Sequence, residues 1–581
     1  MIPVIDGHND LAWARRRRHA LSTQQLHELV AEAHTDIPRL QAGGVGGQFW
    51  SVWVDSSLEG AAQVTATLEQ IDFVHRLVQD YPEVFAFTRT SHEARTAIRQ
   101  GRIASLIGVE GGAQIDNSLG VLRQYARLGA RYMTLTWNHT TDWADAATDA
   151  PRHGGLSEFG RDVVREMNRI GMLVDLAHVA PSTMRDAIAT SIRPVMVSHS
   201  GAAALCDHPR NVPDDVLAAI GAGGGIVMVA FVPTFLSQQR RDWHVAGEVG
   251  TPPEVTIAHV ADHIEHVRAV AGVHAVGIGA DYDGTDAMPT GLEDVSGYQR
   301  LLDELRRRGW SEDELQALAF RNALRVLEAS DADHLAFLSG RQDRPRVLIV
   351  VNADGSGPRR LLSWLNAAGV RADVRHGAHG LPENLESYDG LVMLGGGMMP
   401  DDIEKGPWLP DERRLASEAI ERDLPTLGIC LGGQLLAQIA GGEVRESYGV
   451  KERGSTVITT TSDGRDDAVM SGLGSAAPLI ENHQDQITVL PPDAVLLASS
   501  EGVAIQAFRI GAHVRGVQFH PEVSADDLLW WSEPTDPAPG DRPVADLVAE
   551  ALRVDEQNTA ACQALVRGFA QEVREAAGIR A

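Results

Sequence analysis

Residues 171–200, GMLVDLAHVAPSTMRDAIATSIRPVMVSHS, contain two apolar runs of strand length, separated by an amphipathic segment with helical spacing. Each run leads to a histidine, His178 in the first case and His199 in the second. Two strands joined by a helix form a parallel βαβ unit. The stretch therefore predicts neighbouring parallel strands whose carboxyl ends carry polar side chains.

The same alternation extends from residue 1 to about residue 327. The other runs are IPVID (2–6), RIASLIGVE (102–110), YMTLTW (132–137), GIVMVAF (225–231) and HAVGIGAD (274–281). Acidic or metal-ligand residue types stand at the ends of five runs. In a (β/α)8 barrel the active site is built at the carboxyl ends of the strands, whereas a doubly wound sheet gathers polar residues near one switch point. We therefore expect a TIM barrel.

A second alternation begins with RVLIVVNAD at 346–354 and ends in a predicted helix around 543–577. Between the two parts, the stretch 330–346, SDADHLAFLSGRQDRPR, has the charges and chain breakers of a linker. We expect a barrel at 1–335, a linker at 336–345 and a second α/β domain at 346–581.

The composition narrows the range of functions. With 51 Lys+Arg against 79 Asp+Glu, the formal net charge of the 581 residues is -28, which disfavours nucleic acid and anionic membranes as partners. Three cysteines do not make a disulfide framework. No signal-peptide core is evident, and the longest apolar stretch, 223–236, is shorter than the roughly 20 residues that span a bilayer. We expect a cytoplasmic protein that acts on small molecules.

The residues at the strand ends suggest a metal site. His8 and Asp10 are two residues apart, so on an extended strand both side chains point the same way and can share a cation. Glu110, His178 and His199 each follow an apolar strand. Imidazoles and carboxylates together suit zinc or a similar ion. Each histidine alone could be a satisfied core or loop residue, but the five together predict a metal site.

The first part of the chain resembles the membrane (renal) dipeptidases, a branch of the binuclear metal-dependent amidohydrolase barrels. The resemblance covers residues 1–327 and rests on DGHNDL, IGVEGG, LVDLAHV, SHSGA, HPRNVPDD, GADYDG and GLEDVSGY, in family order. It implies two zinc ions, with a bridging water that attacks the peptide carbonyl. By this resemblance, His8 and Asp10 would bind one ion, His178 and His199 the other, and Glu110 both.

The resemblance also implies residues that act on the substrate. Asp281, in GADYDG, would relay a proton to the leaving amine, whereas a capping role is the alternative mainly for Asp283. Arg210 would bind the C-terminal carboxylate of the substrate, unless it forms a surface salt bridge. Where the family usually has a substrate-binding histidine, this sequence has Trp137, with His139 two residues later. Either His139 swings in, or polarisation of the carbonyl depends on zinc alone.

The second part of the chain has a candidate cysteine nucleophile. An apolar strand leads into Cys430, and glycines then permit a sharp turn into a helix, whose N-terminus favours a thiolate. His520 and Glu522 stand two apart at a later strand end, as a base and its orienting acid would. The alternative is that Cys430 is only a small buried hydrophobe.

This part resembles class I glutamine amidotransferase domains, especially stand-alone versions similar to the amidotransferase part of guanylate synthetase. The resemblance covers 346–525 through VMLGGGM, GICLGGQLLA, ENHQDQI, QAFR and GVQFHPE. A flavodoxin-like α/β fold is expected, with Cys430 as nucleophile, His520 as base and Glu522 as orienting acid. Further candidates are the backbone N–H groups of Gly396 and Leu431, as oxyanion donors. The side chains of Gln434, His483 and Asp485 are candidates for contact with the substrate.

Three functions remain open. In the leading interpretation the chain is a bifunctional hydrolase, in which the cysteine domain removes a γ-glutamyl group and the metal domain cleaves the remaining dipeptide. In the second, the cysteine domain releases ammonia from glutamine for a separate synthetase. In the third, one domain is a catalytically weak binding module, which only Trp137 favours. The expected partners are dipeptides, γ-glutamyl amides or glutamine, with a homo-oligomer and a synthetase partner left open.

Overall fold

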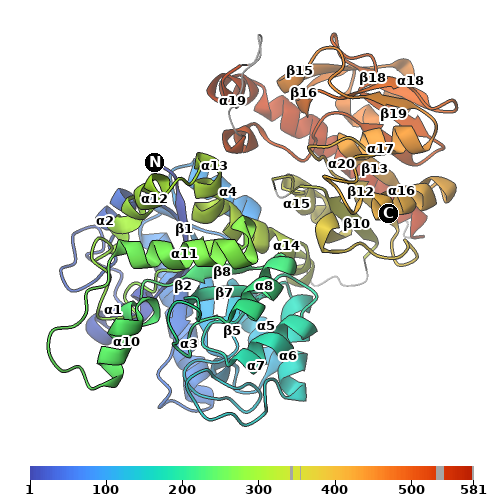
Figure 1. Cartoon of the computed structure of the whole chain (residues 1–581). Coiled ribbons are helices and arrows are strands. Elements are labelled where there is room, and N and C mark those ends of the chain that lie inside the picture. Colours follow the sequence, from blue (N-terminus) through green and yellow to red (C-terminus); the bar gives the residue numbers. More distant parts are fainter. Residues whose placement is uncertain (340–343, 354, 532–541, 579–581) are drawn as a thin grey trace. The chain divides into compact units, whose positions relative to one another are not determined.

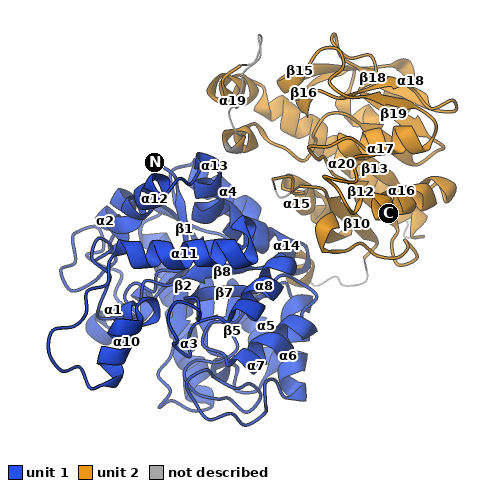
Figure 2. Ribbon diagram, viewed as in Figure 1, with its two compact units in different colours: residues 1–334 blue, residues 335–581 orange. Residues whose placement is uncertain are grey.

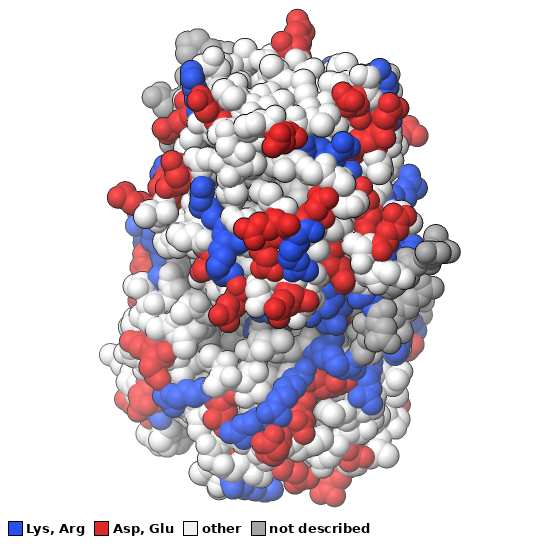
Figure 3. Space-filling model, turned by 90° about the vertical axis from the view of Figure 1, so that its right-hand side faces the viewer, with Lys and Arg blue, Asp and Glu red and all other residues white. Residues whose placement is uncertain are grey.

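The computed structural model describes residues 1–339, 344–353, 355–531 and 542–578. The chain forms two compact units, residues 1–334 and 335–581 (Figure 2). Among the described residues, no helix combines the length and the hydropathy needed to cross a membrane. On the face drawn in Figure 3, basic side chains are flanked by acidic ones.

The parallel strands of the first unit close into a barrel (Figure 1). Closure occurs at β2 (Val45–Trp53), which pairs with β1 (Val4–Asn9) on one side and with β4 (Ile103–Glu110) on the other. The short β3 (Phe85–Phe87) pairs with the edge of β4 outside the ring. This confirms the predicted TIM barrel. The remaining strands of the ring are β5 (Ala130–Thr134), β6 (Leu173–Asp175), β7 (Met196–Ser200), β8 (Ile226–Val229) and β9 (Val276–Ile278), which returns to β1.

Helices surround this ring (Figure 1). Several begin at residues that satisfy the free backbone N–H groups of the first turn, as in α4, where Thr90 and Glu93 form a capping box. The helices are α1 (Leu11–His19), α2 (Ile37–Gly43), α3 (Ala61–Asp80), α4 (Ser91–Arg99), α5 (Leu119–Leu128), α6 (Glu158–Arg169), α7 (Pro181–Thr190), α8 (Asp214–Ala222), α9 (Pro233–Leu236), α10 (Gln238–Val245), α11 (Ile257–Ala271), α12 (Tyr298–Arg307), α13 (Glu312–Gln316) and α14 (Asn322–Leu338).

The apolar runs did not predict β2. Its sequence, VGGQFWSVW, places two glycines and Gln48 where an uninterrupted apolar run would be expected. Gln48 is nevertheless buried, because its Nε2 donates to the carbonyls of Asp6 (3.2 Å) and Phe49 (3.1 Å). The Gln48 side chain is therefore accommodated by hydrogen bonds to carbonyls of β1 and of β2 itself.

The first part of the stretch predicted as a linker is helical. α14 runs through 330–338, so the expected linker at 336–345 begins inside this helix, and residues 340–343 lie outside the described residues. Asp331 and Asp333 are buried against the barrel rather than solvated. Asp331 Oδ1 lies 3.0 Å from Arg131 Nη1, and Asp333 Oδ2 lies 2.7 Å from Arg193 Nη2. These charges anchor α14 to the barrel.

Replacing Asp331 by alanine is expected to lower the free energy of unfolding of the first unit by about 3 kcal/mol, because the buried Arg131 guanidinium loses its carboxylate partner. Denaturant titration measures this change. The control Asp303→Ala removes the exposed ion pair with Arg306 and should cost less than about 1 kcal/mol. Equal losses in both variants would contradict the anchoring role.

The second unit is built on a mixed sheet. Five parallel strands are followed by four antiparallel ones, which confirms an α/β fold. In sheet order they are β11 (Arg371–His376), β10 (Arg346–Val351), β12 (Gly390–Met393), β13 (Thr426–Ile429), β20 (Val514–Val517), β19 (Ala507–Ile510), β18 (Val495–Ser499), β15 (Glu452–Thr460) and β16 (Ala476–His483).

Helices and a small ribbon complete the second unit. The expected helix around 543–577 is divided at Val554 into two helices, α19 and α20. The elements are β14 (Glu443–Arg445) paired with β17 (Gln486–Val489), and the helices α15 (Arg360–Ala367), α16 (Leu409–Glu421), α17 (Leu431–Ile439), α18 (Ser462–Asp466), α19 (Val544–Arg553) and α20 (Asp555–Ala576).

Candidate active sites

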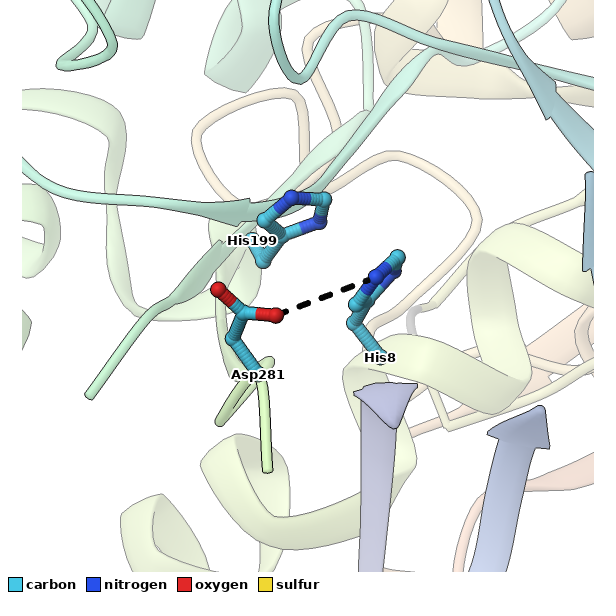
Figure 4. Close-up of side chains that lie close together, drawn as sticks. All are labelled: His8, His199 and Asp281. Carbon is cyan, nitrogen blue, oxygen red and sulfur yellow. Dashed lines mark ion pairs between the residues drawn. The ribbon is translucent and has the colours of Figure 1, made fainter. Parts of the chain in front are cut away.

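The predicted metal ligands come together at the carboxyl ends of the barrel strands. His8 is the second-last residue of β1, Glu110 ends β4, and His199 is the second-last residue of β7. His178 follows β6 and Asp281 follows β9, both with φ of 65°, in the left-handed region. Figure 4 shows His8, His199 and Asp281 facing one another, with His8 Nε2 4.0 Å from Asp281 Oδ1.

Glu110 lies between two sets of donors. Its Oε1 is 2.9 Å from His178 Nε2 and 3.8 Å from His199 Nε2. Its Oε2 is 3.2 Å from His8 Nε2, which in turn is 3.3 Å from Asp10 Oδ2. Each carboxylate oxygen of Glu110 therefore faces a different pair of ligand-type residues.

These residues fit a pair of metal ions. His8 Nε2 is buried and makes no hydrogen bond within the described part of the chain, although it points at three carboxylates. His178 Nε2 and His199 Nε2 lie only 2.9 Å apart, a distance that two protonated imidazoles would not keep. Burial, together with Arg210, lowers the pKa of His178 to about 3, and burial lowers that of His199 well below its usual value. Neutral imidazoles and carboxylates are the donors that zinc-type ions take.

The second ring nitrogen of each histidine has a partner that fixes the orientation of the ring. His8 Nδ1 lies 3.0 Å from a tyrosine hydroxyl and His178 Nδ1 2.9 Å from an asparagine Oδ1. His199 Nδ1 lies 2.9 Å from a serine hydroxyl, which donates to a buried aspartate. These partners were not predicted from the sequence. The one signal that could have indicated them is their position in or beside the predicted strands. They are Tyr132, Asn138, Ser198 and Asp175.

Arg210 is buried beside the predicted metal ligand His199, so it does not form the surface salt bridge that was the alternative. Among the described residues, its Nη1 lies 3.3 Å from Ser200 Oγ and its Nη2 3.4 Å from the His199 carbonyl, both long contacts, and its guanidinium lies over the Phe235 ring. Burial lowers the pKa of Arg210 to about 10, with Asp281 opposing the change. Arg210 therefore stays cationic at neutral pH, with donors available to a ligand.

Trp137 and His139 both line a cavity of about 160 Å³ that reaches Glu110. The Trp137 indole packs against Trp53, with ring centroids 4.8 Å apart. The His139 side chain is 62% exposed, and its Nδ1 lies 4.0 Å from Asp149. The residue between them, Asn138, contacts His178, one of the predicted metal ligands, through its Oδ1.

In the second unit, Cys430 stands at a strained turn between β13 and α17. Its φ is 51°, and its backbone N–H donates to the Val517 carbonyl at 2.8 Å. The turn requires glycine nearby, because a Cβ at Gly432 would lie 2.4 Å from the Met393 carbonyl oxygen. The thiol is thereby held at the N-terminus of α17, where Cys430 is the N-cap residue.

His520 and Glu522 lie beside this thiol. His520 Nδ1 is 2.7 Å from Glu522 Oε1. A Cβ built at Gly395 would lie 2.9 Å from His520 Cε1 and 3.8 Å from Cys430 Sγ, so the glycine allows the two side chains to approach. Burial opposes protonation, but Glu522 and Cys430 raise the pKa of His520 well above its usual value. Gln518, which sequence reasoning missed, donates to Cys430 Sγ at 3.7 Å.

The other candidates in this unit differ in their surroundings. A Cβ at Gly396 would lie 2.7 Å from Leu431 Cδ2, so the Leu431 side chain packs against Gly396. Gln434 Nε2 donates to the Asp485 carbonyl at 3.1 Å. His483, in contrast, contacts two buried glutamates.

Known proteins match each unit separately. The sequence model of the membrane dipeptidase family, peptidase family M19, matches residues 1–336. A crystal structure titled dipeptidase AC, a metallopeptidase of family M19, is 27% identical, with a TM-score of 0.51, covering 57% of this chain and 98% of that one. A metallopeptidase from Rhodobacter sphaeroides, liganded with a phosphinate mimic of the dipeptide L-Ala-D-Ala, is 26% identical, with a TM-score of 0.51, covering 56% and 99%.

The sequence model of class I glutamine amidotransferases matches residues 349–527. A glutamine amidotransferase from Thermotoga maritima aligns at 24% identity over 40% of this chain and 100% of that one, with a TM-score of 0.35. With the metal-ligand cluster in the barrel and the cysteine, histidine and glutamate in the second unit, the chain belongs to the membrane dipeptidase family, M19, and carries a class I glutamine amidotransferase domain fused to it.

Proposed function

We propose that the barrel hydrolyses dipeptides with two zinc-type ions, one held by His8, Asp10 and Glu110 and the other by His178, His199 and Glu110. The observation that carries this proposal is that the two oxygens of Glu110 face different donors. The chemistry that two such ions supply when bound is polarisation of the peptide carbonyl and acidification of a water. The dipeptide mimic bound to the Rhodobacter sphaeroides protein supports the substrate class.

Asp281 is proposed to transfer a proton from the attacking water to the leaving amine. Its carboxylate lies among the ligands, 4.0 Å from His8 Nε2, and burial raises its pKa well above the usual value. A carboxyl group in such surroundings can take a proton from the attacking water and deliver it to the amine nitrogen as the C–N bond breaks. Arg210 would hold the C-terminal carboxylate of the dipeptide by a bidentate contact.

Replacing Arg210 by lysine is expected to raise KM for dipeptides about ten-fold or more, with a smaller change in kcat, because an ammonium group does not form the paired contact. Steady-state kinetics measure the effect. Dipeptide amides, which lack the carboxylate, are the matched substrates. The wild type should turn over these amides as poorly as the variant turns over free dipeptides. A variant that still prefers the free carboxylate as strongly as the wild type would contradict the assignment.

For the second unit we propose hydrolysis of a γ-glutamyl amide through a thioester. The Cys430 thiolate forms a bond to the γ-carbonyl carbon, the C–N bond breaks, and the amine nitrogen takes a proton from His520. Water then cleaves the thioester, with His520 as base, to release glutamate and the thiol. Glu522 orients the imidazole through the 2.7 Å contact with Nδ1, and the backbone N–H groups of Gly396 and Leu431 would stabilise the oxyanion.

The two activities are proposed to act consecutively on γ-glutamyl peptides. Their fusion in one chain supports this order, since removal of the γ-glutamyl group leaves a dipeptide for the barrel. The second candidate function is release of ammonia from glutamine for a separate synthetase, which the match to glutamine amidotransferases favours. A cytoplasmic location, a homo-oligomer and a synthetase partner stay predictions.

One experiment separates these functions. Purified full-length protein is incubated with γ-glutamyl dipeptides, free dipeptides and glutamine in parallel, and the products are identified by mass spectrometry. Conversion of a γ-glutamyl dipeptide first to the dipeptide and then to free amino acids supports consecutive action. Turnover of glutamine without turnover of γ-glutamyl peptides supports the ammonia donor, and no turnover of any of them contradicts both.

A further inference from the structure

A second cluster of buried ligand-type side chains lies in the second unit, on one face of the ribbon formed by β15 and β16. Glu452 on β15 is the direct cross-strand partner of His483 on β16. Glu481 lies two residues before His483, so its side chain is on the same face of the strand. All three residues are buried, and one ligand atom from each lies within 4.8 Å of the others. We call this group the β15–β16 cluster.

The distances within the cluster differ from those of an ordinary buried ion pair. His483 Nε2 lies 3.3 Å from Glu452 Oε2 and 3.5 Å from Glu481 Oε2. Charge-assisted hydrogen bonds are shorter, as in the 2.7 Å contact between His520 and Glu522. Around a tetrahedral ion with metal–ligand distances of about 2.1 Å, neighbouring donor atoms are about 3.4 Å apart.

The barrel offers an internal comparison. There His8 Nε2 lies 3.2 Å from Glu110 Oε2 and 3.3 Å from Asp10 Oδ2, in the group of residues that fits metal ions. The spacing in the β15–β16 cluster matches that around His8 and differs from that of the His520–Glu522 pair. The contacts of Glu110 Oε1 with His178 and His199, 2.9 and 3.8 Å, lie on either side of it.

The cluster also contains buried polar atoms without partners. Neither carboxylate oxygen of Glu481 makes a hydrogen bond among the described residues, although the side chain is fully buried, and the same holds for His483 Nδ1. Gln506 Nε2 and Ser500 Oγ contact the other carboxylate, Glu452, at 2.5 and 2.7 Å. Burial and the neighbouring Glu452 raise the pKa of Glu481 well above its usual value. A buried ionised carboxylate without a partner is costly, so the two glutamates need either a shared proton or a bound cation.

We propose that Glu452, Glu481 and His483 bind one divalent transition-metal ion of the zinc type, in addition to the ions of the barrel. Two carboxylates and one imidazole are donors that such an ion takes, and its charge balances that of the two carboxylates. The ion would also support the cysteine site, because Ile480, next to Glu481, accepts a hydrogen bond from the His520 backbone N–H at 2.8 Å. Its role is to position β16 and His520.

The first test is the metal content of the full-length protein after equilibration with zinc and removal of excess ion. Glu481→Gln should contain one zinc fewer per chain than the wild type, while dipeptide hydrolysis stays unchanged because the barrel ligands are intact. The control Glu412→Gln also removes a buried carboxylate from the second unit, at a place where Asn352 Nδ2 donates to it at 2.9 Å. This control should retain the zinc content of the wild type.

A second measurement does not depend on the folding of Glu481→Gln. In the variant His8→Ala/His178→Ala, both barrel sites lose a ligand while the β15–β16 cluster stays intact, so one zinc per chain should remain. In calorimetry, zinc should then raise the unfolding temperature of the second unit of this variant. Absence of any bound zinc from it, with the protein folded, would overturn the proposal and leave the two glutamates sharing a proton.

Discussion

Replacing Glu110 by glutamine is expected to reduce dipeptide hydrolysis by about a thousand-fold or more and to lower the metal content of the barrel in the same variant. The reason is that one carboxylate serves both donor sets, with Oε1 near His178 and His199 and Oε2 near His8. Glutamine keeps the size and one oxygen, but it lacks the charge and the second oxygen. Metal analysis and steady-state kinetics on the same preparation measure the two losses.

Two further variants sharpen this test. Ser51→Ala removes the hydroxyl that donates to Glu110 Oε2 at 2.9 Å, and it should give a smaller loss than Glu110→Gln because the carboxylate itself remains. Glu166→Gln changes a carboxylate on the outer helix α6, where it pairs with Arg169 and Arg123, and should leave both metal content and activity near the wild type. A Glu110→Gln protein that keeps its metal and its activity would disprove the bridging role.

The sequence allowed the barrel and its strand-end ligands to be predicted for a physical reason. Buried parallel strands are apolar on both faces, so a polar residue such as Glu110 or His199 at the end of a run stands out. The strand β2 was missed because Gln48 is polar and buried, and one of its two hydrogen-bond acceptors, the Asp6 carbonyl, lies on the neighbouring strand β1. Asn138 was missed for the same reason, since its partner His178 lies on another strand end.

Prediction from the sequence failed for a similar reason at α14 and in the second unit. The charges of Asp331 and Asp333 suggest a solvated linker until their arginine partners, which lie far away in the sequence, are placed beside them. His483 was predicted as a candidate for substrate contact from a short motif. Its place opposite Glu452 depends on the register of β15 and β16, which the motif does not contain. Pairing between distant segments is what the local pattern leaves open.

Replacing Cys430 by alanine is expected to abolish release of the γ-glutamyl group while leaving dipeptide hydrolysis intact, because the thiol and the metal ligands belong to different compact units. The thiol is the attacking group in the proposed reaction, so its loss removes the thioester rather than weakening substrate binding. Product analysis with a γ-glutamyl dipeptide should then show unreacted substrate, while the free dipeptide is still cleaved.

The other two cysteines provide matched controls. Burial raises the pKa of Cys206 and of Cys562 to about 11, so both stay protonated and unreactive near neutral pH. Cys206→Ala and Cys562→Ala should keep the γ-glutamyl activity, and an alkylating reagent should modify Cys430 first, as peptide mass mapping would show.

Trapping the intermediate completes this prediction. Rapid quenching of the wild type during turnover should reveal a chain heavier by one γ-glutamyl group, and Cys430→Ala should not show it. His520→Ala should react slowly, because the thiol then loses the imidazole that Glu522 orients at 2.7 Å. If folded wild-type protein gave neither product nor adduct with γ-glutamyl peptides or glutamine, the catalytic assignment would be wrong. The second unit would then act as a binding module beside the dipeptidase barrel.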